Sequence, residues 1–307
     1  MKRIAVKNIC AYLKKDGELY LMLLPCLTVL FVFSYIPYYG LTLAFKNYKT
    51  LSGVMGSPWC GLDNFKKLFG DPYFVKVLLN TVKISVLNLI IGYPLPILLV
   101  ILMNEMYSNR IKKVFQVILY LPYFISWIVL AGIVKSLFNA EDGNINMLIA
   151  KIFGKPIPFY SNGKWFIGLI IFSNVWKGAG WGTVIYLAAV TSISPDLYEA
   201  ATIDGAGRMK RIIHITLPGL RPAIAITLIL SLAGLMQGNF DQIWNMYNKL
   251  LYDDADIIQT YIFRVGIGNG RQYGVTTALG LFESLTGLIL ILIGNFTSKK
   301  ITGEGIW

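Results

Sequence analysis

Residues 191–222 read TSISPDLYEAATIDGAGRMKRIIHITLPGLRP, a polar stretch between two long apolar runs. Ser194 is a good helix N-cap, and Pro195 suits the first helical position that follows it. Asp196 then places a carboxylate in the positively polarised first turn. This order of residues predicts a short helix that runs from Pro195 to about Asp204.

Gly205 follows this helix, at the position where many helices end in a left-handed residue. A second helix can start at Arg208 and extend through Leu217. The whole stretch is too long to be a simple connection between two apolar runs. It therefore predicts a helix-turn-helix that lies at a membrane face.

The rest of the chain is far more apolar than an ordinary soluble domain, because 55% of its 307 residues are hydrophobic and only 14% are charged. A helix that crosses a membrane needs about 20 predominantly apolar residues. Six stretches meet this requirement, and they are residues 19–45, 77–103, 114–138, 166–190, 223–244 and 275–296. The sequence therefore predicts an all-α integral membrane protein with six transmembrane helices.

Orientation follows from lysine and arginine, which stay on the cytoplasmic side when they lie in short loops. They gather in the N-terminal segment, in residues 104–113, in residues 191–222 and in the tail. The basic residues that give the net charge of +12 thus flank the apolar runs. They do not form the basic stripe of a nucleic-acid-binding protein. We predict a multi-pass protein of the cytoplasmic (inner) membrane with both termini inside. Its N-terminal basic residues precede an anchor that is not cleaved, and they are Lys2, Arg3, Lys7, Lys14 and Lys15.

The polar stretch also carries a spaced motif. Glu199-Ala200-Ala201, three residues, Gly205, nine residues and then Ile215-Thr216-Leu217-Pro218 resembles the EAA motif of binding-protein-dependent ABC import permeases. The fuller string from Tyr198 through Ile203, Asp204, Gly205 and Ala206 to Pro218 is similar to the carbohydrate-uptake branch, which includes the maltose permease subunits (MalF-like). Residues 115–132, 176–189, 261–264 and 306–307 resemble the LplB-like permeases for complex oligosaccharides.

This resemblance implies the type I ABC importer permease fold, with a coupling helix that docks on a cytoplasmic ATPase subunit. Adjacent alanines let a partner backbone approach, and Glu199 offers a carboxylate to a basic or backbone-donor group. The alternative is a passive surface helix, in which alanine is only a good helix former. The residues expected to couple to the ATPase are Tyr198, Glu199, Ala200, Ala201, Asp204, Gly205, Ile215, Leu217 and Pro218.

The resemblance further implies the domain division and the partners. Residues 1–72 would hold the N-terminal segment, the first span and an extracytoplasmic loop, residues 73–300 the five-helix core, and residues 301–307 the tail. The implied partners are a second homologous permease subunit, two cytoplasmic ABC ATPase subunits and an extracytoplasmic solute-binding lipoprotein. ATP and Mg²⁺ are expected on the ATPase subunits, because this chain has no G-x-x-x-x-G-K-[ST] string, and the chain itself is expected to hold no cofactor or metal.

Polar side chains within the spans mark a candidate pathway, because such groups usually face a bundle interior or a water-filled cavity. Asn174, Lys177 and Trp181 share one helical face by their spacing of three and four. Aromatic rings beside hydrogen-bonding groups suit a sugar. The pathway candidates are Lys83, Asn174, Trp176, Lys177, Trp181, Gln237, Asn239, Asp241, Trp244 and Glu283.

Other roles remain open for these residues. Lys83 with Glu283, or Lys177 with Asp241, could form buried ion pairs that only fix helix packing. The tryptophans could likewise be ordinary packing residues. Either lysine could instead attract an acidic sugar.

The function we expect is translocation of oligosaccharides by alternating access, driven by the partner ATPases. An ABC permease for a non-sugar solute is the first alternative, and a secondary transporter or a membrane enzyme is less favoured. The single histidine, His214, lies in the motif stretch, so no histidine-based metal cluster or Ser-His-Asp arrangement can form within the membrane. A secondary transporter would favour more spans and an internal repeat.

Overall fold

The computed structural model describes residues 17–268 and 271–303, except for the side chains of residues 301 and 302. The basic N-terminal residues, together with Ile306 and Trp307, lie outside this part of the chain. The chain divides into two compact units, of which the first comprises residues 1–68 and 272–281 and the second residues 69–271 and 282–307. Helices dominate both units, and the one β-bridge among the described residues joins Lys46 to Trp59. The predicted all-α fold class is confirmed.

The first unit begins with an apolar helix over Gly17–Phe45, which agrees with the first predicted span. The loop after it is fixed by Asn64, whose side-chain amide donates to the carbonyls of Ala44 and Lys46 at 3.0 Å each. Lys46 is itself buried and donates to the carbonyl of Val54 at 2.8 Å. The helices that begin in this unit are α2 (Gly17–Leu30), η1 (Phe31–Tyr35), η2 (Ile36–Phe45), α3 (Gly53–Gly56), α4 (Asp63–Gly70) and α17 (Tyr273–Thr302).

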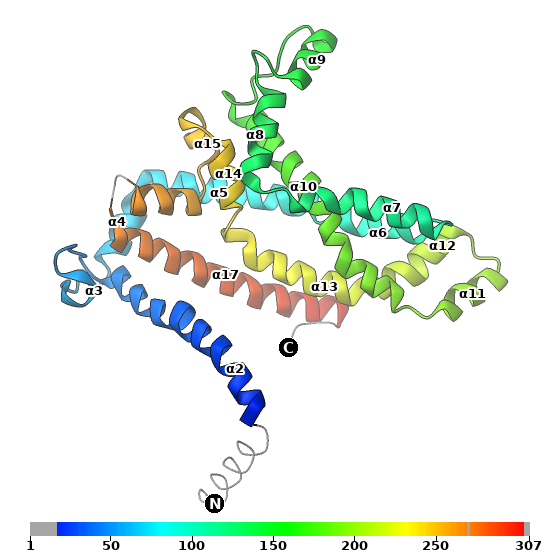
Figure 1. Cartoon of the computed structure of the whole chain (residues 1–307), viewed down its shortest axis with the longest axis horizontal. Coiled ribbons are helices and arrows are strands. Elements are labelled where there is room, and N and C mark those ends of the chain that lie inside the picture. The colour runs from blue at the N-terminus through cyan, green and yellow to red at the C-terminus, as the bar shows by residue number, and fades with distance from the viewer. Residues whose placement is uncertain (1–16, 269–270, 304–307) are drawn as a thin grey trace, which may run out of the picture. The chain divides into compact units, whose positions relative to one another are not determined.

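The second unit is a helical bundle around α10, which spans Gly163–Thr191 (Figure 1). Its other elements are α5 (Pro72–Gly92), α6 (Pro94–Asn104), α7 (Asn109–Tyr120), η3 (Leu121–Phe124), α8 (Trp127–Phe138), α9 (Asn144–Phe153), α11 (Pro195–Ile203), α12 (Arg208–Arg211), η4 (Ile212–Thr216), α13 (Leu217–Ala233), η5 (Gly234–Met236), α14 (Phe240–Met246), η6 (Lys249–Leu251), α15 (Tyr252–Ala255), α16 (Ile258–Ile262) and η7 (Phe263–Ile267). The residues of α17 from Phe282 onward also belong to this unit.

Helix α10 is the central element because it packs against α5, α6, α13 and η3. It begins at Asn162, whose side-chain oxygen accepts from the backbone N–H of Lys164 at 3.1 Å and so caps the first turn. At Gly180 the helix approaches its neighbour so closely that a Cβ atom would lie 1.9 Å from the carbonyl oxygen of Leu119. Glycine is therefore required for this helix pair to pack at its observed separation.

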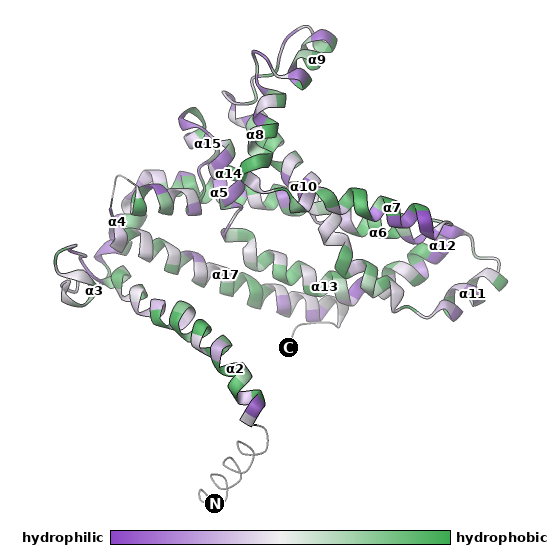
Figure 2. Ribbon diagram, viewed as in Figure 1, coloured by the Kyte–Doolittle hydropathy of each residue, from purple (hydrophilic) through white to green (hydrophobic). Residues whose placement is uncertain are grey.

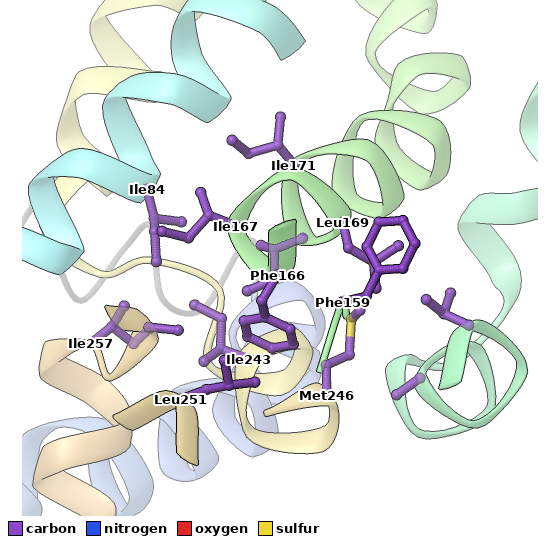
Figure 3. Close-up of a cluster of buried hydrophobic side chains, with 14 of the residues drawn as sticks. Ile84, Phe159, Phe166, Ile167, Leu169, Ile171, Ile243, Met246, Leu251 and Ile257 are labelled. Atoms are coloured by element: carbon purple, nitrogen blue, oxygen red, sulfur yellow. The ribbon is translucent and has the colours of Figure 1, made fainter. Parts of the chain in front are cut away.

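A hydrophobic core surrounds the first half of α10. Phe166 is fully buried, and its ring lies among Ile243, Met246 and Leu251 in Figure 3. Removing such a buried ring typically costs about 3–5 kcal/mol of stability. A second cluster, formed by Val100, Tyr186, Val190 and Leu220, packs α6, α10 and α13 together farther along the same helix.

The six predicted spans are supported unevenly by helix length and apolarity. Within the described residues, four helices are long and apolar enough to cross a membrane, and five if one bent pair counts as a single span. The four are Gly17–Phe45, Pro72–Asn104, Arg208–Met236 and Tyr273–Lys300. Helix α10 covers the fourth predicted span with 29 residues, but Asn174, Lys177 and its glycines make it more polar than the others. These criteria therefore support four or five of the six predicted spans.

The third predicted span, residues 114–138, is not one continuous helix. Residues Asn109–Phe124 and Trp127–Phe138 meet at an angle of 97°. The bend follows from local sequence: Pro122 is the second residue of the 3-10 helix η3, and Ile125 is extended. Ser126 then starts a new helix, because its hydroxyl accepts from the N–H of Val129 at 3.3 Å.

Two predicted boundaries around α13 are also wrong. The fifth span was expected to reach Trp244, but the helix ends at Met236, because Gly238 adopts a left-handed φ of 63° and Asn239 caps the separate helix α14. The second helix of the polar stretch was expected to end near Leu217. It instead continues through the π-turn η4 into α13, because nothing in Ile212–Thr216 interrupts the helical backbone.

A charged cluster ties the start of α5 to α16 and η7. Asp256 is fully buried and forms an ion pair with Arg264, while the Tyr73 hydroxyl donates to the same carboxylate at 2.9 Å. Tyr261 donates to Asp71 at 3.0 Å, and burial together with this hydrogen bond raises the pKa of Tyr261 to about 12. A buried carboxylate that is paired and hydrogen-bonded in this way fixes the loop between α14 and α17 on the bundle.

Candidate functional site

A cleft of about 450 Å³ opens in the second unit where α5, α6, α10, α13 and α14 approach one another. Small residues make room for it, because Gly92, Gly178 and Gly238 all line its wall. Its lining residues are Ile84, Ser85, Asn88, Leu89, Gly92, Tyr93, Pro96, Asn174, Val175, Gly178, Ala179, Leu230, Ser231, Gly234, Leu235, Gly238, Asn239, Gln242 and Ile243. None of these side chains is an acid, a lysine, an arginine or a histidine.

Three amide side chains form a continuous hydrogen-bonded chain along this wall. Asn239 donates to the side-chain oxygen of Asn174 at 3.1 Å, and Asn174 donates to the side-chain oxygen of Asn88 at 3.2 Å. Each asparagine carries two N–H donors and one oxygen, and this chain uses one donor of Asn239 and one of Asn174. The wall therefore keeps hydrogen-bonding capacity that a polar solute can use.

Gln242 adds a buried acceptor to the same wall. Its side-chain N–H groups donate to the carbonyl of Ile170 at 2.6 Å and to the hydroxyl of Ser173 at 2.9 Å. Its side-chain oxygen is buried and has no hydrogen-bond partner among the described residues. Leaving such an acceptor unpaired costs about 1–3 kcal/mol, and because Gln242 is fully buried, a solute in the cleft would reach this oxygen only after the wall rearranges.

The predicted pathway residues do not all gather at this cleft. Asn174 and Asn239 line it, whereas Gln237 and Asp241 are exposed outside the lining. Trp244 packs instead in an aromatic group, with its ring centroid 4.6 Å from that of Phe263.

The two tryptophans of α10 that were predicted for the pathway, Trp176 and Trp181, also lie outside the lining. Trp176 is 46% exposed and Trp181 is 48% exposed. Trp181 stacks on Tyr123 of η3, with ring centroids 4.5 Å apart and an interplanar angle of 7°. The helical face predicted for this part of α10 is thus divided, because Asn174 lines the cleft whereas Lys177 and Trp181 contact the bent span.

The ion pairs considered from the sequence are not formed. None of the salt bridges in the described part of the chain joins Lys83 to Glu283 or Lys177 to Asp241. Lys83 is exposed, and both oxygens of Glu283 accept from the Gln259 amide at 2.7 and 2.9 Å. Lys177 is buried and contacts backbone carbonyls.

Several lining residues escaped the sequence analysis. Asn88 and Gln242 carry much of the polar character of the wall, and Ser85, Tyr93 and Ser231 complete it. The sequence did carry a signal for Asn88, because it is an amide within an apolar span and such residues usually face a cavity. Gln242 was harder to single out, because only the turn at Gly238 brings it to the cleft.

The predicted helix-turn-helix has the local geometry expected of it. The Ser194 hydroxyl accepts from the N–H of Asp196 at 3.3 Å, and α11 ends at Ile203. Gly205 has a φ of 72°. The N–H of Ala206 donates to the carbonyl of Ala201 at 2.8 Å, and that of Gly205 to Thr202 at 3.1 Å, which is the hydrogen-bond pattern of a Schellman C-cap.

Side-chain contacts hold α11 against the start of the following helix. Tyr198 and Thr216 share a hydrogen bond of 3.0 Å between their hydroxyls. Arg211 donates to the Thr202 hydroxyl at 3.1 Å. Of the other motif residues, Ile215 and Pro218 are half-buried and Leu217 is exposed. Hydrophilic residues concentrate around α12 and the start of α7, whereas α2 is hydrophobic along most of its length (Figure 2).

The outer surface of α11 offers both charge and apolar area. Glu199, Ala200 and Asp204 are exposed, and Ala201 is half-buried. Ile203 is 86% exposed and Leu197 is 53% exposed.

The long apolar helices around a polar cleft, together with a separately capped surface helix, define a polytopic membrane protein built to pass a solute. Residues 92–302 match the family of binding-protein-dependent transport system inner membrane components, and the chain belongs to this family. Multi-pass insertion in a membrane follows from the family and the apolar helices.

Curated relatives extend the match over the whole chain. Protein LplB of Bacillus subtilis (strain 168) is 40% identical over 297 residues, which cover 97% of this chain and 93% of that protein. The polygalacturonan/rhamnogalacturonan transport system permease protein YteP of the same organism is 39% identical over 306 residues, covering 100% and 94% of the two chains.

A solved structure shares both sequence and fold. A chain in the crystal structure of a bacterial ABC transporter involved in the import of the acidic polysaccharide alginate superimposes with a TM-score of 0.88 at 38% identity, covering 96% of this chain and 99% of that chain. A chain of a bacterial alginate ABC transporter that was solved in complex with an alginate pentasaccharide-bound periplasmic protein also superimposes with a TM-score of 0.88 at 38% identity, covering 96% of this chain and 99% of that chain. The predicted resemblance to the carbohydrate-uptake permeases is confirmed.

Proposed function

We propose that this chain is the permease subunit of an ABC importer for oligosaccharides and that the solute passes through the polar cleft between α5, α10 and α14. The observation that carries the proposal is the amide wall. Asn239, Asn174 and Asn88 form one hydrogen-bonded chain, and the buried oxygen of Gln242 beside it has no partner among the described residues. A sugar carries many hydroxyl groups, each of which can donate one hydrogen bond and accept others.

The absence of ionised groups from the lining supports recognition by hydroxyl contacts. Relatives that transport polygalacturonan/rhamnogalacturonan and an acidic polysaccharide favour a saccharide over another solute. The mechanism is alternating access, in which the cleft opens to one side of the membrane at a time. The chain performs no covalent chemistry in this scheme, and ATP with Mg²⁺ is consumed on partner subunits.

The partners follow from the family and from the surface of α11. We propose a second, homologous permease subunit, two cytoplasmic ATPase subunits and an extracytoplasmic solute-binding lipoprotein. The relative solved with its periplasmic binding protein supports the last of these. The coupling surface comprises Tyr198, Glu199, Ala200, Ala201, Asp204, Gly205, Ile215, Leu217 and Pro218, where exposed apolar side chains beside Glu199 suit an ATPase groove. Both termini then lie in the cytoplasm.

Transport by the assembled complex tests the cleft. Gln242→Leu keeps the side-chain volume but removes the hydrogen-bonding groups, so uptake of labelled oligosaccharide should fall by roughly tenfold or more while the complex still assembles. The matched control is Asn245→Ala, because Asn245 lies on the same helix, is exposed and is outside the lining. Equal uptake by both variants and the unmodified protein contradicts the proposal. Uptake of a non-sugar solute only would favour the alternative ABC permease function.

A further inference from the structure

Lys177 is a buried cation in the middle of α10, and its contacts are all on the bent span. Its ammonium nitrogen donates to the carbonyls of Tyr123 at 2.6 Å and Ile125 at 2.5 Å, and it reaches that of Pro122 at 3.5 Å. Only 9% of the residue is exposed. An ammonium group has three N–H donors and no acceptor, so these three carbonyls account for its full hydrogen-bonding capacity.

The carbonyls of Tyr123 and Ile125 lie at the break, where a continuous helix would have satisfied them, whereas that of Pro122 also accepts from the N–H of Ile125 at 3.2 Å. The last carbonyls of any helix lack intrahelical partners and carry partial negative charge. Here they lie where Asn109–Phe124 and Trp127–Phe138 meet at 97°, within an apolar segment. Broken backbone at membrane depth persists only where neighbouring groups satisfy it.

Aromatic rings enclose the same ammonium group. Its nitrogen lies 5.3 Å from the ring centroid of Tyr123 and 5.4 Å from that of Trp127, which places both within the range of cation–π attraction. These two residues flank the bend on either side. The cation is thus held by the two arms of the broken span at once.

We infer that Lys177 is a positioning residue that caps the broken third span and fastens it to α10, and that it is not a ligand for a substrate anion. Gly180, three residues on, supports this because it lets α10 approach the carbonyl of Leu119. Trp181 then stacks on Tyr123. The bent span is thus joined to α10 at Lys177, Gly180 and Trp181, and α10 leads through Ser192 into the segment that holds α11.

This inference goes beyond the proposed function. The two have one measurement in common, the uptake of oligosaccharides. The decisive variant is Lys177→Met, which keeps an unbranched side chain and removes the donors and the charge. Lys135→Met is the matched control, because Lys135 is also a lysine within an apolar helix but is exposed in the last turn of α8. Lys177→Gln retains two N–H donors. It takes the place of Lys177→Met in the test if the complex with Lys177→Met does not assemble.

Two readouts are independent of transport. The melting temperature of the purified complex should fall by roughly 5 °C for Lys177→Met and stay unchanged for Lys135→Met. A single cysteine at Phe124, which is 74% exposed beside the bend, should change its labelling rate with a thiol reagent only in the Lys177 variants. Native melting temperature and labelling in both Lys177→Met and Lys177→Gln would overturn the inference.

The third readout separates a cap from a ligand. Uptake of a neutral and an anionic oligosaccharide of equal length should fall by the same factor in Lys177→Met, because the bend is altered for every solute. A loss confined to the anionic oligosaccharide, with normal stability, would assign Lys177 to substrate binding instead. If the complex imports neither oligosaccharide even when unmodified, the proposed function fails, and the first two readouts still decide the role of Lys177.

Discussion

Asn174 in the middle of α10 accepts a hydrogen bond from Asn239, the residue that caps α14, at a distance of 3.1 Å. This contact joins the central helix to the turn that ends α13. Each partner has a second task, because Asn174 donates to Asn88 and the side-chain oxygen of Asn239 accepts from the N–H of Gln242 at 3.2 Å. The cleft wall and the local fold therefore depend on the same two side chains.

The pair should show energetic coupling in a double-mutant cycle. Asn174→Ala and Asn239→Ala should each reduce oligosaccharide uptake, and the double variant should lose less than the product of the two single effects, because the second change removes a contact that is already broken. A coupling of about 0.5–3 kcal/mol is expected for residues in direct contact. Uptake measured in vesicles at equal complex content provides the test. Independent effects would show that the two amides act separately.

The turn after α11 should tolerate no side chain. Gly205→Val places a β-branched residue at a φ of 72°, which costs roughly 1 kcal/mol or more before any partner is considered. Coupling of ATP hydrolysis to uptake should drop while the protein still inserts in the membrane. The control is Gly207→Ala, since Gly207 has a φ of −68° and open space around its Cα. Normal coupling in Gly205→Val would make this segment a passive loop.

Charge reversal at Glu199 tests the partner-facing side of α11. The carboxylate is exposed, so Glu199→Lys should leave the fold intact. It should release the ATPase subunit in a pull-down, because a cation replaces an acceptor and stands in the N-terminal half of a helix. Glu199→Gln, which keeps an acceptor, should retain more of the association. Full retention by the lysine variant argues against a contact at this residue.

Gly180→Ala should destabilise the bundle. The added Cβ would lie 1.9 Å from a backbone carbonyl oxygen, so α10 must shift away from α7. Overpacking of this kind typically costs about 1–3 kcal/mol, and thermal unfolding of the purified complex measures it. Gly168→Ala on the same helix has nothing within 4 Å and should be neutral or stabilising. Equal melting temperatures for the two variants would mean that the helix pair is looser than observed.

Orientation can be read from single cysteines in a background without other cysteines. An impermeant thiol reagent applied to intact cells should label positions 56 and 254, which we place outside, and should spare positions 109 and 208. Both Gly56 and Asp254 are exposed, as are Asn109 and Arg208, so accessibility within the chain does not limit the reaction. Labelling at position 208 with none at position 254 reverses the topology.

Local signals in the sequence predicted the ends of α11 well, because capping depends on residues within one turn of each other. Ser194 at one end and Gly205 at the other act through their own backbone neighbours. The bend near Pro122 also had a local marker, because a proline interrupts this run, but the run is apolar enough overall to be predicted as a single span. Apolarity reports the surrounding lipid and not the direction of the helix axis.

The cleft was predicted only in part, because its wall is assembled from distant segments. Asn174 and Asn239 were singled out as amides in apolar runs, which is a property of each residue alone. Their link to Asn88 spans 86 residues of sequence and has no periodic signature. For Lys177 the sequence predicted burial of a charge but could not identify its partners, since these are backbone carbonyls that every residue possesses.

Together, α12, η4, α13 and η5 give one helix of 29 residues from Arg208 to Met236. At 1.5 Å per residue it is about 44 Å long, close to the full depth of a bilayer with its headgroups. One end adjoins the turn after α11, and the other carries Leu230, Ser231 and Gly234 along the cleft. The helix thus connects the coupling segment directly to the cleft wall, and a pivot of roughly 5° about one end would move the other end by about 4 Å.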